Sequence, residues 1–193
     1  MIQWELIPMI KGVFFVMNPN PSNPRFSIQK FAYLSLLTSA CVVGRLFFVW
    51  LPNVQPMTAI LLLLAFYGSL TDTLLVSLLS LFITNLYLGL GTWTISQMIA
   101  FSGIILFFHC IRKLPLVAKH VSIQAVFSFF CGIIYGLIVS RIETFIYQIP
   151  SFWVYYFQGL PFDFAHGMGN FFFYILLFPL FQRIVFPLYR KHR

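Results

Sequence analysis

The stretch GRLFFVWLPNVQPMTAILLLLAFYG, residues 44–68, places two apolar runs on either side of the proline-bounded segment PNVQP. Proline lacks the N–H that a helix interior needs, so Pro52 with Asn53 ends one helix and Pro56 begins another. The second run stops at Gly68, and its twelve residues rise only about 18 Å, whereas a bilayer core is about 30 Å thick. The stretch therefore predicts a membrane helix and then a short helix, which is either extended by neighbouring loops or begins deep in the membrane beside a cavity.

The remainder of the chain has the same apolar character. Of its 193 residues, 60% are hydrophobic and 8% are charged, whereas soluble domains carry about 25% charged residues. Mean hydropathy is +0.90, and each span needs roughly 20 apolar residues, which leaves no room for a separate soluble domain. We expect an all-α integral membrane protein of about six transmembrane helices, at residues 31–51, 56–67, 71–88, 94–111, 121–146 and 162–188. Thr71 or Asp72 is the expected N-cap of the third helix, and residues 147–161 are expected to form a long aromatic loop.

The first 30 residues are predicted to precede the six-helix domain, which covers residues 31–193. Residues 1–17 contain Glu5 and Lys11 but no small-residue cleavage site, so they fit an interfacial amphipathic helix better than a signal peptide. The run NPNPSNPR, residues 18–25, has three prolines among polar residues and predicts a linker.

Lysine and arginine are found at alternate connections. They precede the first helix and follow the fourth and the sixth helices. These residues are Arg25, Lys30, Arg112, Lys113, Lys119, Arg190, Lys191 and Arg193. The positive-inside rule then places both termini in the cytoplasm, which requires an even number of spans and predicts a multi-pass protein of the cell membrane. We interpret the net charge of +8 as a topology signal rather than a nucleic-acid patch.

The three cysteines, Cys41, Cys110 and Cys131, lie inside apolar runs without CxxC spacing. This pattern predicts neither a disulfide framework nor a metal site. Small apolar packing residues are the simpler interpretation.

The three predicted outer loops are PNVQP, LGLGTWTISQ and YQIPSFWVYYFQGLPFD. They combine uncharged hydrogen-bonding groups with aromatic rings, the mixture that small-molecule pockets use, at Asn53, Gln55, Thr92, Trp93, Thr94, Gln97, Gln148, Trp153, Tyr155, Tyr156 and Gln158. For the tryptophan and tyrosines of the last loop, an aromatic belt at the headgroup level explains the pattern equally well. A belt does not explain the amides, which favour a pocket.

Arg45 lies inside the first helix, where a charge needs a partner or a path to water. We expect it to pair with Asp163, with Glu143 as the other outer acid, or else to extend its side chain to the interface. In the string FDFAHGMGN, Asp163, His166 and Asn170 are spaced three and four apart, on one helical face. An acid/base pair would need a nucleophile or second carboxylate, so a structural or ligand-contacting cluster is the favoured interpretation.

The first helix also carries small residues at four-residue spacing, which allow another helix to approach closely or pack internally. With the six helices and the polar outer rim, this pattern resembles the substrate-binding S components of energy-coupling factor (ECF) ABC transporters. The strings GRLFFVWLPNVQPMTAI, NLYLGLGTWTISQM and GLPFDFAHGMGN carry the resemblance, which covers residues 31–188 and is closest to the cobalamin-specific, CbrT-type branch.

The resemblance implies a protein that captures a vitamin outside the cell, with cobalamin as the first expectation and pantothenate, folate, riboflavin or pyridoxine as alternatives. It implies no enzymatic activity and no tightly bound cofactor. A transmembrane coupling protein, EcfT, and two ATPases, EcfA and EcfA', which bind the ATP, would supply the energy, and the S component would topple in the membrane to deliver its ligand.

The resemblance also implies roles for particular residues. The first helix would dock on EcfT through an AxxxA-like motif, which corresponds here to Ala32, Ser35, Ser39, Ala40 and Gly44, although no AxxxA is present. Ligand contacts would come from the outer loops and helix ends, at Arg45, Asn53, Gln55, Thr92, Trp93, Thr94, Gln97, Tyr155, Gln158, Asp163, His166 and Asn170.

Three other functions remain open from the residues alone. Asp163 and His166 could serve an intramembrane enzyme, and the aromatic loop could bind another protein in a membrane assembly subunit. A pore or secondary carrier is the third, but the sequence has no inverted repeat and no chain of intramembrane acids.

Overall fold

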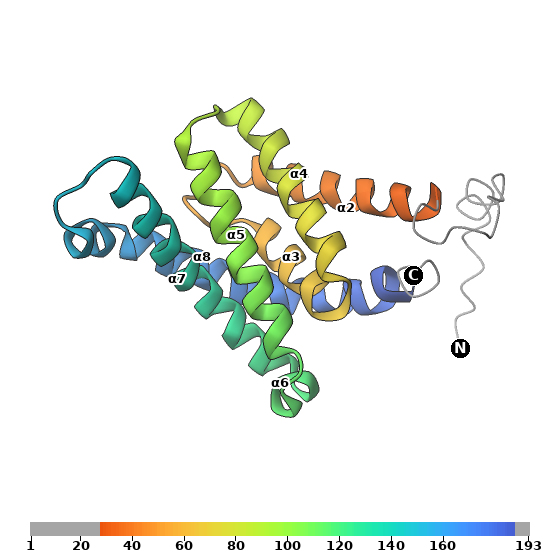
Figure 1. The fold of residues 1–193 in the computed structure, drawn as a ribbon. Helices are drawn as coiled ribbons and strands as arrows, with labels where there is room; N and C mark the ends of the chain where they lie inside the picture. Colours follow the sequence, from red (N-terminus) through yellow and green to blue (C-terminus); the bar gives the residue numbers. More distant parts are fainter. Residues whose placement is uncertain (1–27, 188–193) are drawn as a thin grey trace, which may run out of the picture.

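The computed structural model describes residues 28–187, which form helices and no strand. The elements are α2 (Ile28–Phe47), α3 (Pro56–Tyr67), α4 (Leu70–Leu88), α5 (Thr92–Ile111), α6 (Pro115–Lys119), α7 (Val121–Ile146), α8 (Phe152–Leu180) and the π-helix η2 (Phe181–Val185) (Figure 1). The predicted amphipathic segment and linker, Arg25 and the basic residues after Pro187 lie outside the described residues.

Five of these helices are long and apolar enough to cross a membrane: α2, α4, α5, α7 and the continuous α8–η2 unit. The sequence predicts about six spans. The predicted span that is not among these five is the second one, which corresponds to α3, and its twelve residues are too few to cross alone. The all-helical prediction is thus confirmed for residues 28–187, which include five helices that could span a membrane. The bounds predicted for α3 and α7 are also those of the structure.

The short helix α3 lies at the centre of the fold. All of its residues from Pro56 to Phe66 are buried, and it contacts α2, α4, α5 and α8. A helix that is apolar on every side has no solvent-facing or lipid-facing stripe, so it is most stable with neighbours all round. The other helices surround it in Figure 1.

The connections of the bundle lie at two ends. The site end holds the α2–α3, α4–α5 and α7–α8 connections, toward the left and top of Figure 1, and the terminal end holds the start of α2, the α3–α4 turn, α6 and η2, toward the right and bottom. Contacts link these segments: the Asn53 amide, between α2 and α3, donates to the Phe162 carbonyl of α8 (3.4 Å), and the hydroxyls of Thr92, at the start of α5, and Tyr147, after α7, are hydrogen-bonded. The three loops predicted to share one side therefore do so.

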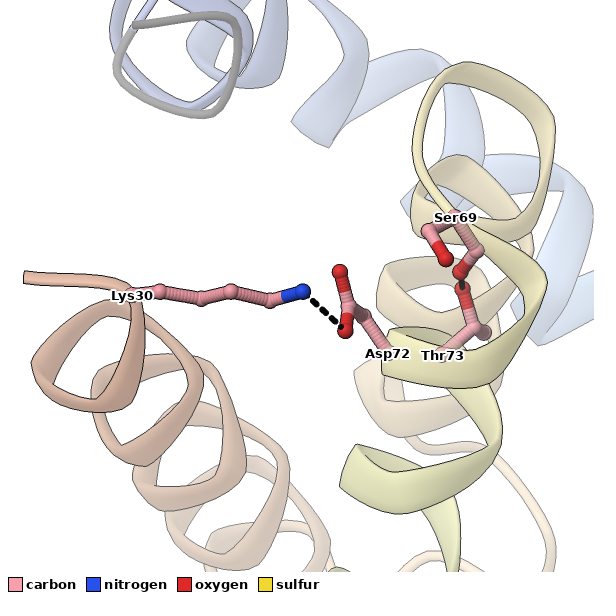
Figure 2. A network of polar contacts seen from close by, with 4 residues as sticks. All are labelled: Lys30, Ser69, Asp72 and Thr73. Carbon is pink, nitrogen blue, oxygen red and sulfur yellow. Dashed lines mark hydrogen bonds and ion pairs between the residues drawn. The ribbon is translucent and has the colours of Figure 1, made fainter. Parts of the chain in front are cut away.

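The basic residues of the terminal end make specific contacts. Lys30 of α2 forms an ion pair with Asp72 of α4, with 2.9 Å between Nζ and Oδ1, and Figure 2 shows Lys30 extended toward Asp72 beside Ser69 and Thr73. Arg112, after α5, donates to the Gly68 carbonyl (3.1 Å) and the Phe66 carbonyl (3.4 Å). A cation at the carboxy-terminal end of α3 both satisfies its last carbonyls and complements its dipole.

The largest correction to the sequence prediction concerns the expected aromatic loop. Only residues 147–151 connect the two helices, because α8 begins at Phe152 and continues through Pro161. The Ser151 hydroxyl caps its first turn by accepting from the Val154 N–H (3.5 Å). A proline removes one backbone hydrogen bond, whereas an unfolded loop near the bilayer would leave many unpaired, so the helix is the better solution here.

Other boundaries differ by smaller amounts. The first spanning helix ends at Phe47 rather than Leu51, and α5 begins at Thr92 rather than Thr94. Helix α4 begins at Leu70 with Ser69 at the N-cap, so neither Thr71 nor Asp72 occupies that position, and Asp72 instead lies in the first turn. The one-turn helix α6 was not anticipated, because its five residues, which begin with Pro115, carry too short a pattern to detect.

Candidate functional site

Arg45 forms the centre of a polar network between α2, α4 and α5. Its side chain is buried, and its guanidinium donates to Thr84 Oγ1 (2.6 Å) and Gln97 Oε1 (3.3 Å). The Asn85 amide donates to the same Gln97 oxygen (2.9 Å) and to Thr94 Oγ1 (3.1 Å). One arginine is thereby held by neutral oxygens from two other helices.

The predicted pairing of Arg45 with Asp163 is wrong. Within residues 28–187 the one ion pair is Lys30–Asp72, and the Arg45 guanidinium points instead at α4 and α5. Only two of its five N–H donors are engaged by these described residues. A buried cation with neutral partners and spare donors can accept an anionic or carbonyl-bearing group from outside the chain.

The face of α8 that carries Asp163, His166 and Asn170 points into the bundle, as its spacing predicts, because all three residues are buried. His166 Nε2 is 2.9 Å from Thr58 Oγ1 on α3, and the Asn170 amide donates to the Ser128 carbonyl of α7 (3.3 Å). Two oxygens on this face, Asp163 Oδ2 and Asn170 Oδ1, have no hydrogen-bond partner. The face is therefore fixed by α3 and α7 but retains free acceptors.

Glycines allow α7 and α8 to meet this closely. A Cβ added at Gly132 would be 2.5 Å from the Gly167 nitrogen, and one at Gly167 would be 2.7 Å from the Phe129 carbonyl oxygen. One turn further on, a Cβ at Gly136 would overlap the Asp163 carboxylate. Backbone contact between the two helices thus creates the space in which Asp163 sits.

Tyr135 of α7 contacts the helices that carry the two polar groups. Its ring packs edge-on against His166 of α8 and against Phe101 of α5, with 4.9 Å between centroids in each pair. Tyr135 therefore lies between α8, which carries the polar face, and α5, which carries Gln97 of the Arg45 network.

The predicted loop residues are divided between this site and the surface. Thr94 and Gln97 belong to the Arg45 network, and Gln55 is half-buried at the N-cap of α3. Asn53, with a left-handed backbone (φ 59°), donates to the Phe162 carbonyl in the third turn of α8. Thr92, Trp93 and Gln158 are exposed, and the Tyr155 hydroxyl donates to Glu143 Oε2 (2.6 Å).

The exposed aromatic rings of the α7–α8 connection favour the aromatic-belt interpretation there. Trp153 and Tyr147 are 61% and 52% exposed. The continuous α8–η2 unit of 34 residues is about 50 Å long, so its first turns extend beyond a bilayer core of about 30 Å. Aromatic side chains at that level meet the headgroups.

Sequence reasoning missed several residues of the site, notably Thr58, Thr84, Asn85 and Tyr135. A signal for Thr84 exists on α4, where Thr73, Ser77, Ser80 and Thr84 are spaced four, three and four apart and are all buried. A polar stripe of helical period inside an apolar helix indicates the face that points away from lipid. Thr58 and Tyr135 carry no such signal, because single hydroxyls in apolar runs are common.

The chemical resources of the site are one guanidinium, one carboxylate, one imidazole and several amides and hydroxyls. Ser96 Oγ of α5 adds a third buried atom without a partner, beside Asp163 Oδ2 and Asn170 Oδ1. His166 is hydrogen-bonded to Thr58 rather than to Asp163. Among residues 28–187, no cluster of three histidine, cysteine or acidic side chains has the arrangement to hold a metal ion. Such a set suits hydrogen-bonded recognition of an organic molecule.

Comparison with known proteins returned no match to a family model, a curated protein or a solved structure.

Proposed function

We propose that this chain is the substrate-binding S component of an ECF-type ABC transporter, which captures a vitamin at the site end and delivers it across the cell membrane. Cobalamin and related corrinoids are the first candidate ligands. In this proposal the site end faces outward and the terminal end faces the cytoplasm, in agreement with the distribution of lysine and arginine.

One observation carries the proposal: buried polar groups from α2, α3, α4, α5, α7 and α8 gather in a membrane bundle, and two acceptors on α8, Asp163 Oδ2 and Asn170 Oδ1, lack partners. Each unsatisfied buried polar atom costs about 1–3 kcal/mol, more inside a bilayer, and a ligand that donates to these atoms would offset that cost. Arg45 has spare N–H donors for the acceptors of the same ligand.

The chemistry of these groups bears on the ligand. A carboxamide both donates and accepts hydrogen bonds, so it matches a site that offers a carboxylate, an amide oxygen and guanidinium N–H groups. Corrinoids carry several peripheral carboxamides, which makes them the first candidates. Pantothenate, folate, riboflavin and pyridoxine have fewer such groups and are the alternatives.

Energy would come from EcfT and the ATPases EcfA and EcfA', and α2 supports a docking role. Ala32, Ser35, Ser39 and Ala40 are exposed along one side of α2, where small side chains allow a partner helix to approach. Gly44 faces the other way, since a Cβ there would be 2.7 Å from Pro56 Cγ. We therefore assign the docking face to the first four residues and the packing of α3 to Gly44.

The deciding experiment is isothermal titration of the detergent-purified chain, without partners, against cobalamin, cobinamide, pantothenate, folate, riboflavin and pyridoxine. We expect nanomolar binding of the two corrinoids. Tight binding of another vitamin would replace the ligand and keep the function, whereas no binding of any of them would overturn the proposal in favour of an assembly subunit.

Variants locate the binding at the site end. Asp163→Asn preserves size but removes the charged acceptor, and we expect it to weaken binding about tenfold or more. The matched control is Ser122→Ala, an exposed residue of α7 at the terminal end, which should bind as the unaltered chain does. Bound ligand recovered chemically unchanged supports a binding protein, and conversion to a product would favour an intramembrane enzyme.

A further inference from the structure

A cavity at the terminal end is separate from the site described above. Its volume is about 740 Å³, and it lies between the end of α3, the α6–α7 junction and the α8–η2 unit. Its lining includes Tyr67, Lys119, Val121, Phe178, Gln182 and Phe186. Ligand pockets commonly have volumes of about 300–1,000 Å³, so the cavity is large enough for part of a small organic molecule.

Hydrogen bonds and ring contacts hold the walls of this cavity in place. The hydroxyls of Tyr67 (α3) and Tyr174 (α8) both donate to Gln124 Oε1, at 3.0 and 2.9 Å, and the Gln124 amide donates to the Val117 carbonyl of α6 (2.9 Å). The Tyr67 ring lies 4.4 Å from that of Phe186. Residues of α3, α6, α7 and α8 thereby fix the walls of a partly open cavity.

The lining divides into an apolar wall and a polar edge. Phe178, Phe186 and Val121 provide the wall, whereas Lys119 and Gln182 provide a cation and an amide, and no acid from residues 28–187 lines the cavity. Gln182 belongs to the π-helix Phe181–Val185, and such wide turns are frequent at functional sites.

The excess of basic residues around the cavity favours an occupant with a negative charge. The described residues of the terminal end include Lys30, Arg112, Lys113, Lys119 and Arg183, against one acid, Asp72, which pairs with Lys30. Arg190, Lys191 and Arg193 follow directly in the sequence after Pro187, which also lines the cavity. A membrane-level cavity with aromatic walls and a cationic surround matches an anionic amphiphile.

We propose that this cavity binds an anionic glycerophospholipid, with the phosphate at Lys119 and Gln182 and the first acyl carbons on Phe178 and Phe186. Basic pockets between membrane helices recognise lipid headgroups in this way. The lipid would contact α3, α6–α7 and α8–η2 at the end of the bundle where the Gln124 hydrogen bonds also connect α3, α6, α7 and α8. The site is independent of the ligand-binding proposal for the site end.

Native mass spectrometry of the full chain, extracted from vesicles of phosphatidylcholine with one-fifth phosphatidylglycerol, tests the proposal. We expect one phosphatidylglycerol to remain bound, and Lys119→Gln to reduce its retention about fivefold, as expected for loss of one cation beside an anionic headgroup. Ala118→Phe, which fills the cavity without changing the charge, should do the same. Ala118 and Lys119 are both exposed, so neither variant should impair folding, and a thermal melt confirms this.

The matched control is Lys113→Gln, which removes the same charge from an exposed residue outside the cavity lining and should retain the lipid. Equal loss with Lys113→Gln, or full retention with Ala118→Phe, would overturn the proposal by showing a surface-charge effect. Equal affinity for glycerol 3-phosphate would overturn it in favour of a soluble phosphate. Increased retention after deletion of residues 188–193 would overturn it in favour of the chain's own end as occupant.

Discussion

At the scale of single residues, the hydrogen bonds of Arg45 predict different effects of its removal on stability and on ligand binding. Thr84 Oγ1 also donates to the Ser80 carbonyl (2.8 Å), and Gln97 Oε1 also accepts from Asn85 (2.9 Å). Both partners of Arg45 therefore keep a hydrogen bond when the guanidinium is absent. We therefore expect the fold to depend little on this charge, whereas binding of the proposed ligand through the spare N–H donors would require it.

Arg45→Leu is accordingly expected to change the free energy of unfolding by less than about 1 kcal/mol, since it also removes the desolvation cost of a buried charge. Thr84→Val should be worse, by roughly 1–3 kcal/mol, because it leaves the guanidinium without its closer acceptor. Thermal unfolding in detergent shows which of the two variants is less stable. A titration with cobalamin should show weaker binding for Arg45→Leu. A less stable Arg45→Leu than Thr84→Val would contradict this account.

Gly136→Ala tests the packing that places Asp163. The added methyl group overlaps the Asp163 carboxylate, so we expect a loss of roughly 1–3 kcal/mol in unfolding free energy, as for other overpacked positions, together with weaker ligand binding. Gly159→Ala is the control: nothing lies within 4 Å of its added Cβ, and the exchange should gain about 0.5–1 kcal/mol from helix propensity. Equal melting temperatures for the two variants would count against the contact.

At the scale of elements, the first turns of α8 distinguish the structure from the expected loop. The backbone of residues 156–160 should exchange amide hydrogen slowly, because these N–H groups are bonded within the helix. Gln148 and Ser151 of the connection should exchange quickly, whereas the Ile149 N–H is bonded to the Thr144 carbonyl (3.0 Å). Ser151→Ala should speed exchange in the first turn by removing the cap, at a cost of about 0.5–2 kcal/mol. Hydrogen–deuterium exchange measured by mass spectrometry distinguishes the helix from the loop. Equally fast exchange in both segments would favour the aromatic loop that the sequence predicts.

The contact between α2 and α4 at the terminal end gives a second test at this scale. The Lys30 side chain is 29% exposed and that of Asp72 is 7% exposed, so Lys30→Gln should lower the unfolding free energy by roughly 1–3 kcal/mol. A double-mutant cycle with Asp72→Asn should give a coupling energy that shrinks as salt is raised. Lys113→Gln, at an exposed lysine, serves as the control, and strictly additive effects would show that the pair contributes nothing.

At the scale of the whole molecule, the alternation of its connections predicts the orientation in the membrane. The site-end connections carry no lysine or arginine, whereas basic residues surround the terminal end. In a chain whose own cysteines are replaced, Gln148→Cys should react with a membrane-impermeant thiol reagent on intact cells. Lys113→Cys should react only after the cells are opened. The reverse pattern would invert the topology and with it the proposed direction of transport.

The central position of α3 also depends on contacts across the whole molecule. Because α3 is too short to span alone, the depth at which it begins is set by its neighbours, and Pro56 packs against Gly44 of α2 while Val54 packs against Gly169 of α8. These contacts bring Thr58 to His166. The short apolar run thereby becomes a positioning element of the site.

The sequence alone determined where most helices lie, that the chain is a membrane bundle, and that Asp163, His166 and Asn170 share one inward face. These features follow from local chemistry, because in lipid an apolar segment must satisfy its own backbone hydrogen bonds, and a helix does so residue by residue. The α4–α5 and α2–α3 connections were located for the same reason, by glycines and prolines that interrupt that pattern.

Only the tertiary structure decided the partners of Arg45, the participation of Thr84, Asn85 and Tyr135, and the space that Gly136 leaves for Asp163. It also decided that α8 continues through Pro161. Rotation of each helix about its axis and its distance from its neighbours depend on side chains far apart in the chain. In a bilayer, where most residue types are apolar on every face, the sequence pattern carries little information about either.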